Sequence, residues 1–311
     1  MTTAQHSPKL SIVATMYKSE SYIVEFCNRV SGAAEAITSD FEIVLVNDGS
    51  PDDSLDVALR YRVGNQKVRV VDLSRNFGHH PAMITGLAQA RGQFVYLTDI
   101  DLEEEPELLG RYWTTILQNT DVDVIAGLQI NRAGSTFGNL LGNSAWSFLA
   151  SISHIDLPQN MLTTRLMTRR FIEAVLTYPE REIFVEALFA DAGYKQIFIA
   201  VQKKKQQDST YSLVKRMQLF LAGLTSVSVA PLYFAIYLTL IMVAVLVGIV
   251  FYALWSALNG SNVPGWTSIV FLVALSTALI LSVQSLMGIY LAHIFKEVKR
   301  RPLTVIRKIH E

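Results

Sequence analysis

The sequence predicts an α/β protein, with a mostly parallel sheet covered by helices on both faces, followed by an interfacial helix and a two-helix transmembrane hairpin. Three observations support this fold class. Short apolar runs alternate with helix-length stretches over residues 10–130. Two long stretches without any charged residue follow near the C-terminus. Clusters of lysine and arginine stand before the first of them and after the second, as they do at the ends of membrane helices.

The predicted strands are short apolar runs, each followed by a stretch long enough for a helix. Because a helix separates successive strands, neighbouring strands should be parallel and joined by right-handed crossovers. Ser50 and Pro51 are suited to open one of the helices, as its N-cap and first residue. The strands are expected at residues 10–14, 41–46, 68–71, 94–97 and 122–126, and the helices at 19–37, 52–63, 81–90 and 106–117.

Composition excludes several classes of protein. The 311 residues include 27 basic and 27 acidic side chains, and this zero net charge gives no reason to expect a nucleic-acid partner. Cys27 is the single cysteine, so no intrachain disulfide can form, and this fits a reducing compartment. No Gly-x-Gly-x-x-Gly follows the first strand and no Walker lysine motif occurs, so dinucleotide and P-loop sites have no support.

Two C-terminal stretches predict membrane helices. Residues 227–258 and 263–292 carry no charge, and each exceeds the roughly 20 residues that cross a bilayer. The loop between them is neutral, whereas the outer flanks are basic, which predicts that both termini are cytoplasmic. The alternative is a helical hairpin buried in a soluble protein.

One acidic run predicts a metal site. Asp99 and Asp101 directly follow the apolar run 94–97, which places two carboxylates at the carboxyl edge of a parallel sheet, where such sheets bind ligands. Hard cations such as Mg²⁺ or Mn²⁺ prefer oxygen ligands of this kind. The alternative is that the acidic run before Pro106 only opens a helix. Asp48 ends another strand and should face the same edge, unless it is a turn residue before Gly49.

Several motifs together resemble a known family. They are Val-Asn-Asp-Gly-Ser-Pro-Asp-Asp-Ser at residues 46–54, Leu-Ser-Arg-Asn-Phe-Gly-His-His at 73–80, the Asp-x-Asp-Leu-x-x-x-Pro-Glu pattern at 99–107, and the stretches 165–170, 179–181 and 208–211. They resemble family-2 glycosyltransferases of the GT-A (Rossmann-like) fold. Within that family they are most similar to the polyisoprenyl-phosphate glycosyltransferases, the group of dolichyl-phosphate mannose synthase and bacterial undecaprenyl-phosphate glycosyltransferases.

The resemblance implies an activity. A sugar would be transferred, with inversion, from a nucleotide-diphosphate sugar to a polyprenyl phosphate, undecaprenyl phosphate in bacteria, for synthesis or modification of a cell-envelope glycan or lipopolysaccharide. The enzyme would be a multi-pass protein of the inner membrane with its catalytic domain in the cytoplasm. Its cofactor would be Mg²⁺ or Mn²⁺. Its partners would be the nucleotide sugar, the polyprenyl phosphate and the membrane. The protein could also form a homo-oligomer.

The resemblance also implies roles for individual residues, because the donor diphosphate needs a cation and the anionic acceptor phosphate needs basic groups. The residues are Asp99, Asp101 and Arg165 for catalysis; Thr15, Tyr17, Glu20, Asp48, Arg75 and Asp99 for the donor; Arg132, Arg165, Lys204 and Ser209 for the acceptor phosphate; and Asp99, Asp101 and Glu103 for the metal.

The chain is expected to have four parts, with residues 1–210 as the cytoplasmic GT-A domain, 211–226 as an interfacial amphipathic helix, 227–294 as a two-helix anchor and 295–311 as a basic cytoplasmic tail. Two other functions remain open. A processive polysaccharide synthase would usually carry a Gln-x-x-Arg-Trp motif, which does not occur here. A non-catalytic membrane scaffold of the same fold is the other alternative.

Overall fold

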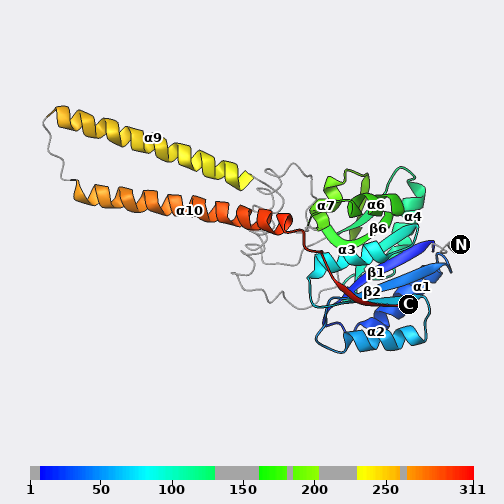
Figure 1. Cartoon of the computed structure of the whole chain (residues 1–311). Coiled ribbons are helices and arrows are strands. Elements are labelled where there is room, and N and C mark those ends of the chain that lie inside the picture. Colours follow the sequence, from blue (N-terminus) through cyan, green and yellow to red (C-terminus); the bar gives the residue numbers. More distant parts are fainter. Residues whose placement is uncertain (1–7, 130–160, 181–184, 203–229, 260–264) are drawn as a thin grey trace. The chain divides into compact units, whose positions relative to one another are not determined.

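The computed structural model describes residues 8–129, 161–180, 185–202, 230–259 and 265–311 (Figure 1). The chain divides into two compact units. The first contains the sheet and, in addition, the C-terminal residues Arg301–Glu311, and the second contains the two long helices that lie between Tyr211 and Arg300. Each unit is described by itself.

The first unit is built on one mixed sheet. Its described strands follow the order β7-β5-β6-β4-β1-β2-β3-β8. Strands β1, β2, β3, β4, β5 and β7 share one direction, and β6 and β8 are antiparallel to their neighbours. The bounds are Leu10–Met16 for β1, Phe41–Asn47 for β2, Val68–Leu73 for β3, Phe94–Asp99 for β4, Val124–Gln129 for β5, Met161–Thr168 for β6, Gln196–Val201 for β7 and Ile306–His310 for β8.

Helices pack on both faces of this sheet, because the central strands bury apolar side chains on both sides. Along β1, Ile12 and Ala14 join the core under α1, α2 and α4, whereas Val13 joins the core under α3, α6 and α7. Figure 1 shows α3, α6 and α7 on one side of β1 and β2, and α2 on the other. The helices are α1 Ile23–Glu35, α2 Ser54–Val63, α3 His79–Gln89, α4 Leu108–Gln118, α6 Arg169–Leu176 and α7 Val185–Asp191.

The structure confirms the predicted α/β class, with most strands of the sheet parallel and helices on both faces. The predicted strands and helices up to residue 129 all form, with ends shifted by a few residues. Strands β6, β7 and β8 and helices α6 and α7 were not predicted. The antiparallel strand β6 interrupts the parallel order between β4 and β5, so the sheet is mixed.

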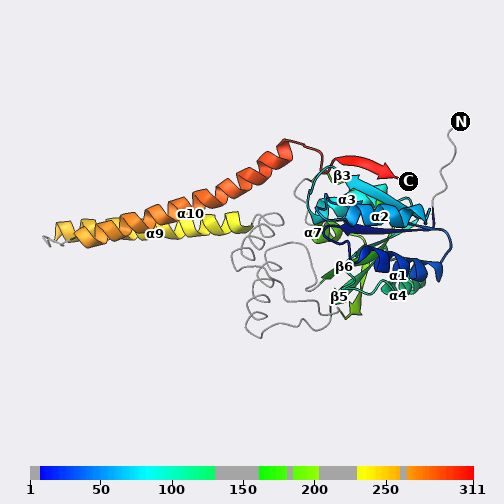
Figure 2. The same cartoon turned by 90° about the horizontal axis from the view of Figure 1, so that it is seen from below.

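The end of the chain is a strand of the sheet. Residues 306–310 form β8, antiparallel to β3, with Leu73 opposite Ile306 and Val70 opposite His310; Figure 2 shows this red strand beside β3. Arg307 donates a hydrogen bond to the carbonyl of Ser74 at 2.7 Å. Residues 295–311 were expected to be a separate basic tail, but their last part covers the sheet edge that β3 would otherwise expose.

The second unit contains the long helices α9, Ala230–Leu258, and α10, Trp266–Val298. They contact each other, and both figures show them running alongside one another. Within the described residues, one helical segment, Leu275–Val298, is long and apolar enough to cross a membrane. The predicted interfacial helix at 211–226 lies outside the described residues.

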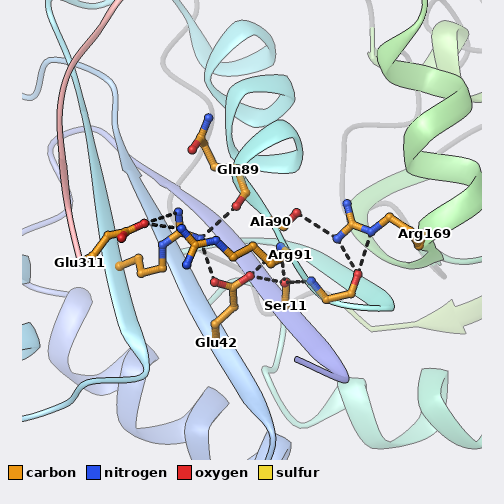
Figure 3. Close-up of polar contacts among 9 residues, drawn as sticks. Ser11, Glu42, Gln89, Ala90, Arg91, Arg169 and Glu311 are labelled. Carbon is orange, nitrogen blue, oxygen red and sulfur yellow. Dashed lines mark hydrogen bonds and ion pairs between the residues drawn. The ribbon is translucent and has the colours of Figure 1, made fainter. Parts of the chain in front are cut away.

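A buried polar network holds the amino-terminal edge of the sheet (Figure 3). Glu42 accepts hydrogen bonds from Ser11 Oγ at 2.6 Å and from the backbone N–H of Arg91 at 2.7 Å. Its other oxygen lies 2.8 Å from Arg69, and both of these charged side chains are less than a tenth exposed. Arg69 also pairs with Glu311 at 3.2 Å. The last residue of the chain is therefore tied to the starts of β1, β2 and β3.

Candidate active site

The candidate site lies where the strand order reverses. From β1 the chain continues to β2 on one side, whereas β4 pairs with β1 on the other. Ligands of open α/β sheets bind at such a switch point, beyond the carboxyl ends of the strands. Thr15 on β1 and Asp99 on β4 are direct partners in the register at this point. The predicted carboxylate at the end of β4 therefore stands at the switch point itself.

A tight turn follows Asp99 and fixes the second carboxylate. Asp101 Oδ1 accepts a hydrogen bond from the backbone N–H of Glu103 at 3.0 Å. Leu102, between them, has a φ of 60°, a left-handed conformation that is uncommon for leucine. Ile100 is buried in the core below α1 and α4. The turn therefore fixes the backbone that carries Asp101, two residues beyond the strand end.

His79 joins this site, although it was not among the predicted site residues. Its Nε2 lies 3.3 Å from Asp99 Oδ1, and its Nδ1 lies 3.1 Å from Thr15 Oγ1. Burial lowers the pKa of His79, but its hydrogen bond to Asp99 and the charges of Asp99, Glu186 and Asp101 outweigh burial, so the pKa is raised. The signal in the sequence was the histidine pair that ends the Leu-Ser-Arg-Asn-Phe-Gly-His-His motif.

Asp48 shapes the loop that leads to His79. Its carboxylate accepts backbone hydrogen bonds from Phe77 at 2.7 Å and from Gly78 at 3.0 Å. The side chain is 3% exposed, and this burial raises its pKa in spite of the two hydrogen bonds. Gly49 has a φ of +58°, and a Cβ there would lie 2.4 Å from the backbone of Arg75. The two loops can meet only because position 49 has no side chain.

The other predicted donor residues surround the same edge. Tyr17 is 46% exposed beyond the end of β1. Glu20 accepts a hydrogen bond from the backbone N–H of Asp53 at 3.2 Å, which links the loops after β1 and β2. The guanidinium of Arg75 stacks over the ring of Phe77 at 4.0 Å. The structure thus places Thr15 at the end of β1, and Tyr17, Glu20, Asp48 and Arg75 on the loops that follow β1, β2 and β3.

Arg165 lies behind the site rather than on its surface. It is 1% exposed, and its guanidinium donates to the carbonyls of Leu162 at 2.9 Å and Thr163 at 3.0 Å. It also lies 4.6 Å from the ring centre of Phe189 on α7. Burial lowers its pKa, and the charges of Glu186 and nearby acids oppose this shift. These contacts favour a role in holding α7 against β6, and its acceptor role stays a prediction.

Arg165→Lys is expected to lower the free energy of unfolding by about 1–3 kcal/mol, because an ammonium cannot satisfy both carbonyls as the guanidinium does. The KM values for both substrates should rise alike. Steady-state kinetics and urea unfolding measure these effects, with the exposed Arg111→Lys as the matched control. A rise confined to the KM for polyprenyl phosphate would instead support direct contact with the acceptor.

The remaining predicted acceptor residues, Arg132, Lys204 and Ser209, lie outside the described residues. Among the described residues, no group of three or more histidine, cysteine, aspartate or glutamate side chains is arranged to hold a metal ion. The site still suits a divalent ion, because Mg²⁺ is commonly held by one or two carboxylates together with substrate phosphates and water. Asp99 and Asp101 could supply those two carboxylates. Glu103 lies at the end of the turn that contains Asp101.

Comparison with known proteins shows the family of this chain. The model of the family "Glycosyl transferase family 2" matches residues 11–176. A Mycobacterium tuberculosis protein named as a glycosyltransferase is 36% identical, with 97% of this chain and 88% of that protein covered. The undecaprenyl-phosphate 4-deoxy-4-formamido-L-arabinose transferase of Photorhabdus laumondii is 27% identical, with 97% and 94% covered. The SfII prophage-derived bactoprenol glucosyl transferase of Shigella flexneri is also 27% identical, with 97% and 98% covered.

A solved structure shares the fold. The glucosyl-3-phosphoglycerate synthase of Mycobacterium tuberculosis, in complex with Mn²⁺, UDP-glucose and phosphoglyceric acid, superposes with a TM-score of 0.50. It is 16% identical, and the match covers 70% of this chain and 79% of that one. The family match spans the strands that form the switch point, together with Asp48, Asp99 and Asp101. This chain belongs to glycosyl transferase family 2, and it is a glycosyltransferase with the GT-A fold.

Proposed function

We propose that this enzyme transfers a sugar from a nucleotide-diphosphate sugar to a polyprenyl phosphate at the cytoplasmic face of the membrane, with inversion at the anomeric carbon. The observation that carries the proposal is the pair Asp99 and Asp101 at the switch point, in a chain that also contains a helical segment apolar enough to span a bilayer. The names of the relatives, which include a bactoprenol and an undecaprenyl-phosphate transferase, support the acceptor class.

The donor side of the proposal rests on the ends of β1 and β4 and on the loops after β1, β2, β3 and β4. Asp99 and Asp101, with Glu103 beside them, would hold Mg²⁺ or Mn²⁺, and the bound ion would supply positive charge for the leaving diphosphate. Mn²⁺ and UDP-glucose are bound together in the solved enzyme of the same fold. Thr15, Tyr17, Glu20, Asp48 and Arg75 would position the nucleotide, with Asp48 acting through the backbone of the loop before His79.

Attack by the acceptor phosphate needs little help from a general base. A phosphate is already anionic at neutral pH, so its oxygen can attack the anomeric carbon while the bond to the donor diphosphate breaks. What it needs is placement by cationic and hydrogen-bonding groups. We assign this role to Arg132, Lys204 and Ser209, whereas Arg165, which is buried on β6, would support the site indirectly. The proposed division of the chain therefore keeps residues 1–210 as the catalytic part.

Strand β8 supports a membrane hairpin. Residues on both sides of the long helices belong to the sheet unit, because β8 pairs with β3. The two flanks must then lie on one side of the membrane, which requires an even number of crossings between them. If Leu275–Val298 crosses the bilayer, one further crossing is needed, and α9, with 29 residues, is long enough to provide it.

A transfer assay tests the proposed reaction. Membranes that contain the full chain are incubated with a panel of radiolabelled nucleotide sugars and with undecaprenyl phosphate. The expected result is label in the organic extract for one donor, dependent on added polyprenyl phosphate. Transfer to water-soluble sugar acceptors alone would contradict the proposal and point to another family-2 activity. No transfer from any donor of the panel would favour the non-catalytic scaffold.

Cysteine labelling tests the topology. Cys27 is fully buried and burial raises its pKa to about 12, so the unmodified chain should not react and serves as the control. We expect Ser261→Cys to react in intact cells with a membrane-impermeant thiol reagent, because the loop after α9 should be outside. Val63→Cys, at a position that is 83% exposed in the sheet unit, should react only after the cells are opened. The reverse pattern would place the catalytic unit outside the cytoplasm.

A further inference from the structure

The imidazole of His79 bridges two strand ends at the switch point. One ring nitrogen lies 3.1 Å from Thr15 Oγ1 at the end of β1, and the other lies 3.3 Å from Asp99 Oδ1 at the end of β4. Thr15 and Asp99 are register partners, so the ring lies across the boundary between these two strands. It contacts one of the two carboxylates that the proposed metal site depends on.

The backbone before His79 is held independently. Asp48, after the end of β2, accepts the N–H groups of Phe77 and Gly78. Gly78 has a φ of +105°, a conformation open to glycine, and it turns the chain into the first residue of α3. The ring of His79 is therefore placed by the ends of β1, β2 and β4 together. This support is what a residue needs if it is to orient another side chain accurately.

The neighbouring histidine has different surroundings. His80 Nε2 lies 3.9 Å from Glu186 Oε2 on α7, whereas the Nε2 of His79 points to Asp99. The two residues have the same side chain and are adjacent in the chain. A change at His80 therefore serves as a matched control for the loss of an imidazole at this helix start.

We propose that His79 is a positioning residue, whose Nε2 lies 3.3 Å from Asp99 Oδ1 and holds that carboxylate in the orientation for binding the divalent ion. The inference rests on the proposed metal site. A carboxylate that is held by such a contact has fewer orientations to lose when the ion binds. Groups that orient metal ligands typically change metal affinity by about 10- to 100-fold when they are removed.

The test measures Mn²⁺ binding to the full chain in detergent by electron paramagnetic resonance, with Mn²⁺ as the added ligand. His79→Ala is expected to weaken Mn²⁺ binding about 10- to 100-fold. His79→Gln should recover most of the affinity, because its amide can donate from nearly the same position as the imidazole Nε2. His80→Ala should bind as the unmodified chain does, and Asp101→Asn should bind least.

The outcomes separate this inference from the proposed function. If Asp101→Asn weakens binding and His79→Ala does not, the role of His79 is wrong and the metal site stands. If Asp101→Asn binds Mn²⁺ normally, or the unmodified chain takes up none, the role of His79 and the proposed metal site are both wrong. Pulsed measurements add a further check, because a nitrogen coupling to Mn²⁺ that vanishes in His79→Ala would make His79 a ligand and overturn the positioning role.

Discussion

Asp101→Asn is expected to lower kcat on the order of 1,000-fold or more, while the protein still folds. The change removes one negative charge from the proposed metal site. The amide oxygen of asparagine can still accept the N–H of Glu103, so the turn that contains Leu102 at a φ of 60° should persist. Asp101 is a cleaner target than Asp99, because a change at Asp99 would also remove the partner of His79.

Turnover of the lipid acceptor measures the effect, with and without EDTA. The matched control is Glu105→Gln, which removes the same charge from an exposed position in the same acidic run and should leave kcat within about twofold, since it has no place in the proposed site. Near-normal turnover of Asp101→Asn, or activity that survives EDTA, would show that the carboxylates do not act through a divalent ion.

Glu42→Leu is expected to cost about 3–5 kcal/mol of unfolding free energy, because it leaves Arg69 charged and buried without its closest partner. The Arg69–Glu42 distance is 2.8 Å and Arg69 is 7% exposed. Glu311, which also pairs with Arg69, is half exposed and cannot replace it. Removing both charges, in Glu42→Leu with Arg69→Leu, should recover a large part of the loss.

The free energy of unfolding can be measured through the reactivity of the buried Cys27. A short pulse of thiol reagent in increasing urea labels only unfolded chains, because the native thiol is inaccessible and has a pKa of about 12. The control is Glu35→Leu, which breaks the exposed pair of Glu35 with Lys67 at 3.5 Å and should cost no more than about 1 kcal/mol. Equal losses for Glu42→Leu and Glu35→Leu would contradict a structural role for the buried pair.

Local patterns were sufficient for the first half of the sheet. The apolar runs that become β1 to β5 alternate with helix-length stretches, and each apolar run is short and bounded by turn residues, so the type of each element could be predicted. The same reasoning located Asp48 and Asp99 at strand ends, because carboxyl ends of parallel strands meet at one edge. The later strands gave weaker signals. The β6 stretch, Met161–Thr168, contains three threonines and an arginine, so its burial on the sheet does not show in the pattern.

The C-terminal strand could not be predicted for a different reason. Ile306–His310 carries two basic side chains and a histidine in five residues, which is typical of a solvated tail. It becomes a strand because β3 offers an unpaired edge and because Arg307 and Glu311 find partners on residues far away in the sequence. No local property of the segment contains that information.

The sequence by itself determined the family, the α/β class and the carboxylates at the strand ends, because these depend on residue type and short-range spacing. Only the tertiary structure decided that Thr15 faces Asp99, that His79 bridges the two, and that Arg165 is buried against α7. Those relations depend on strand order and on register. They arise when segments distant in the chain pack together, and hydropathy or motif spacing does not encode them.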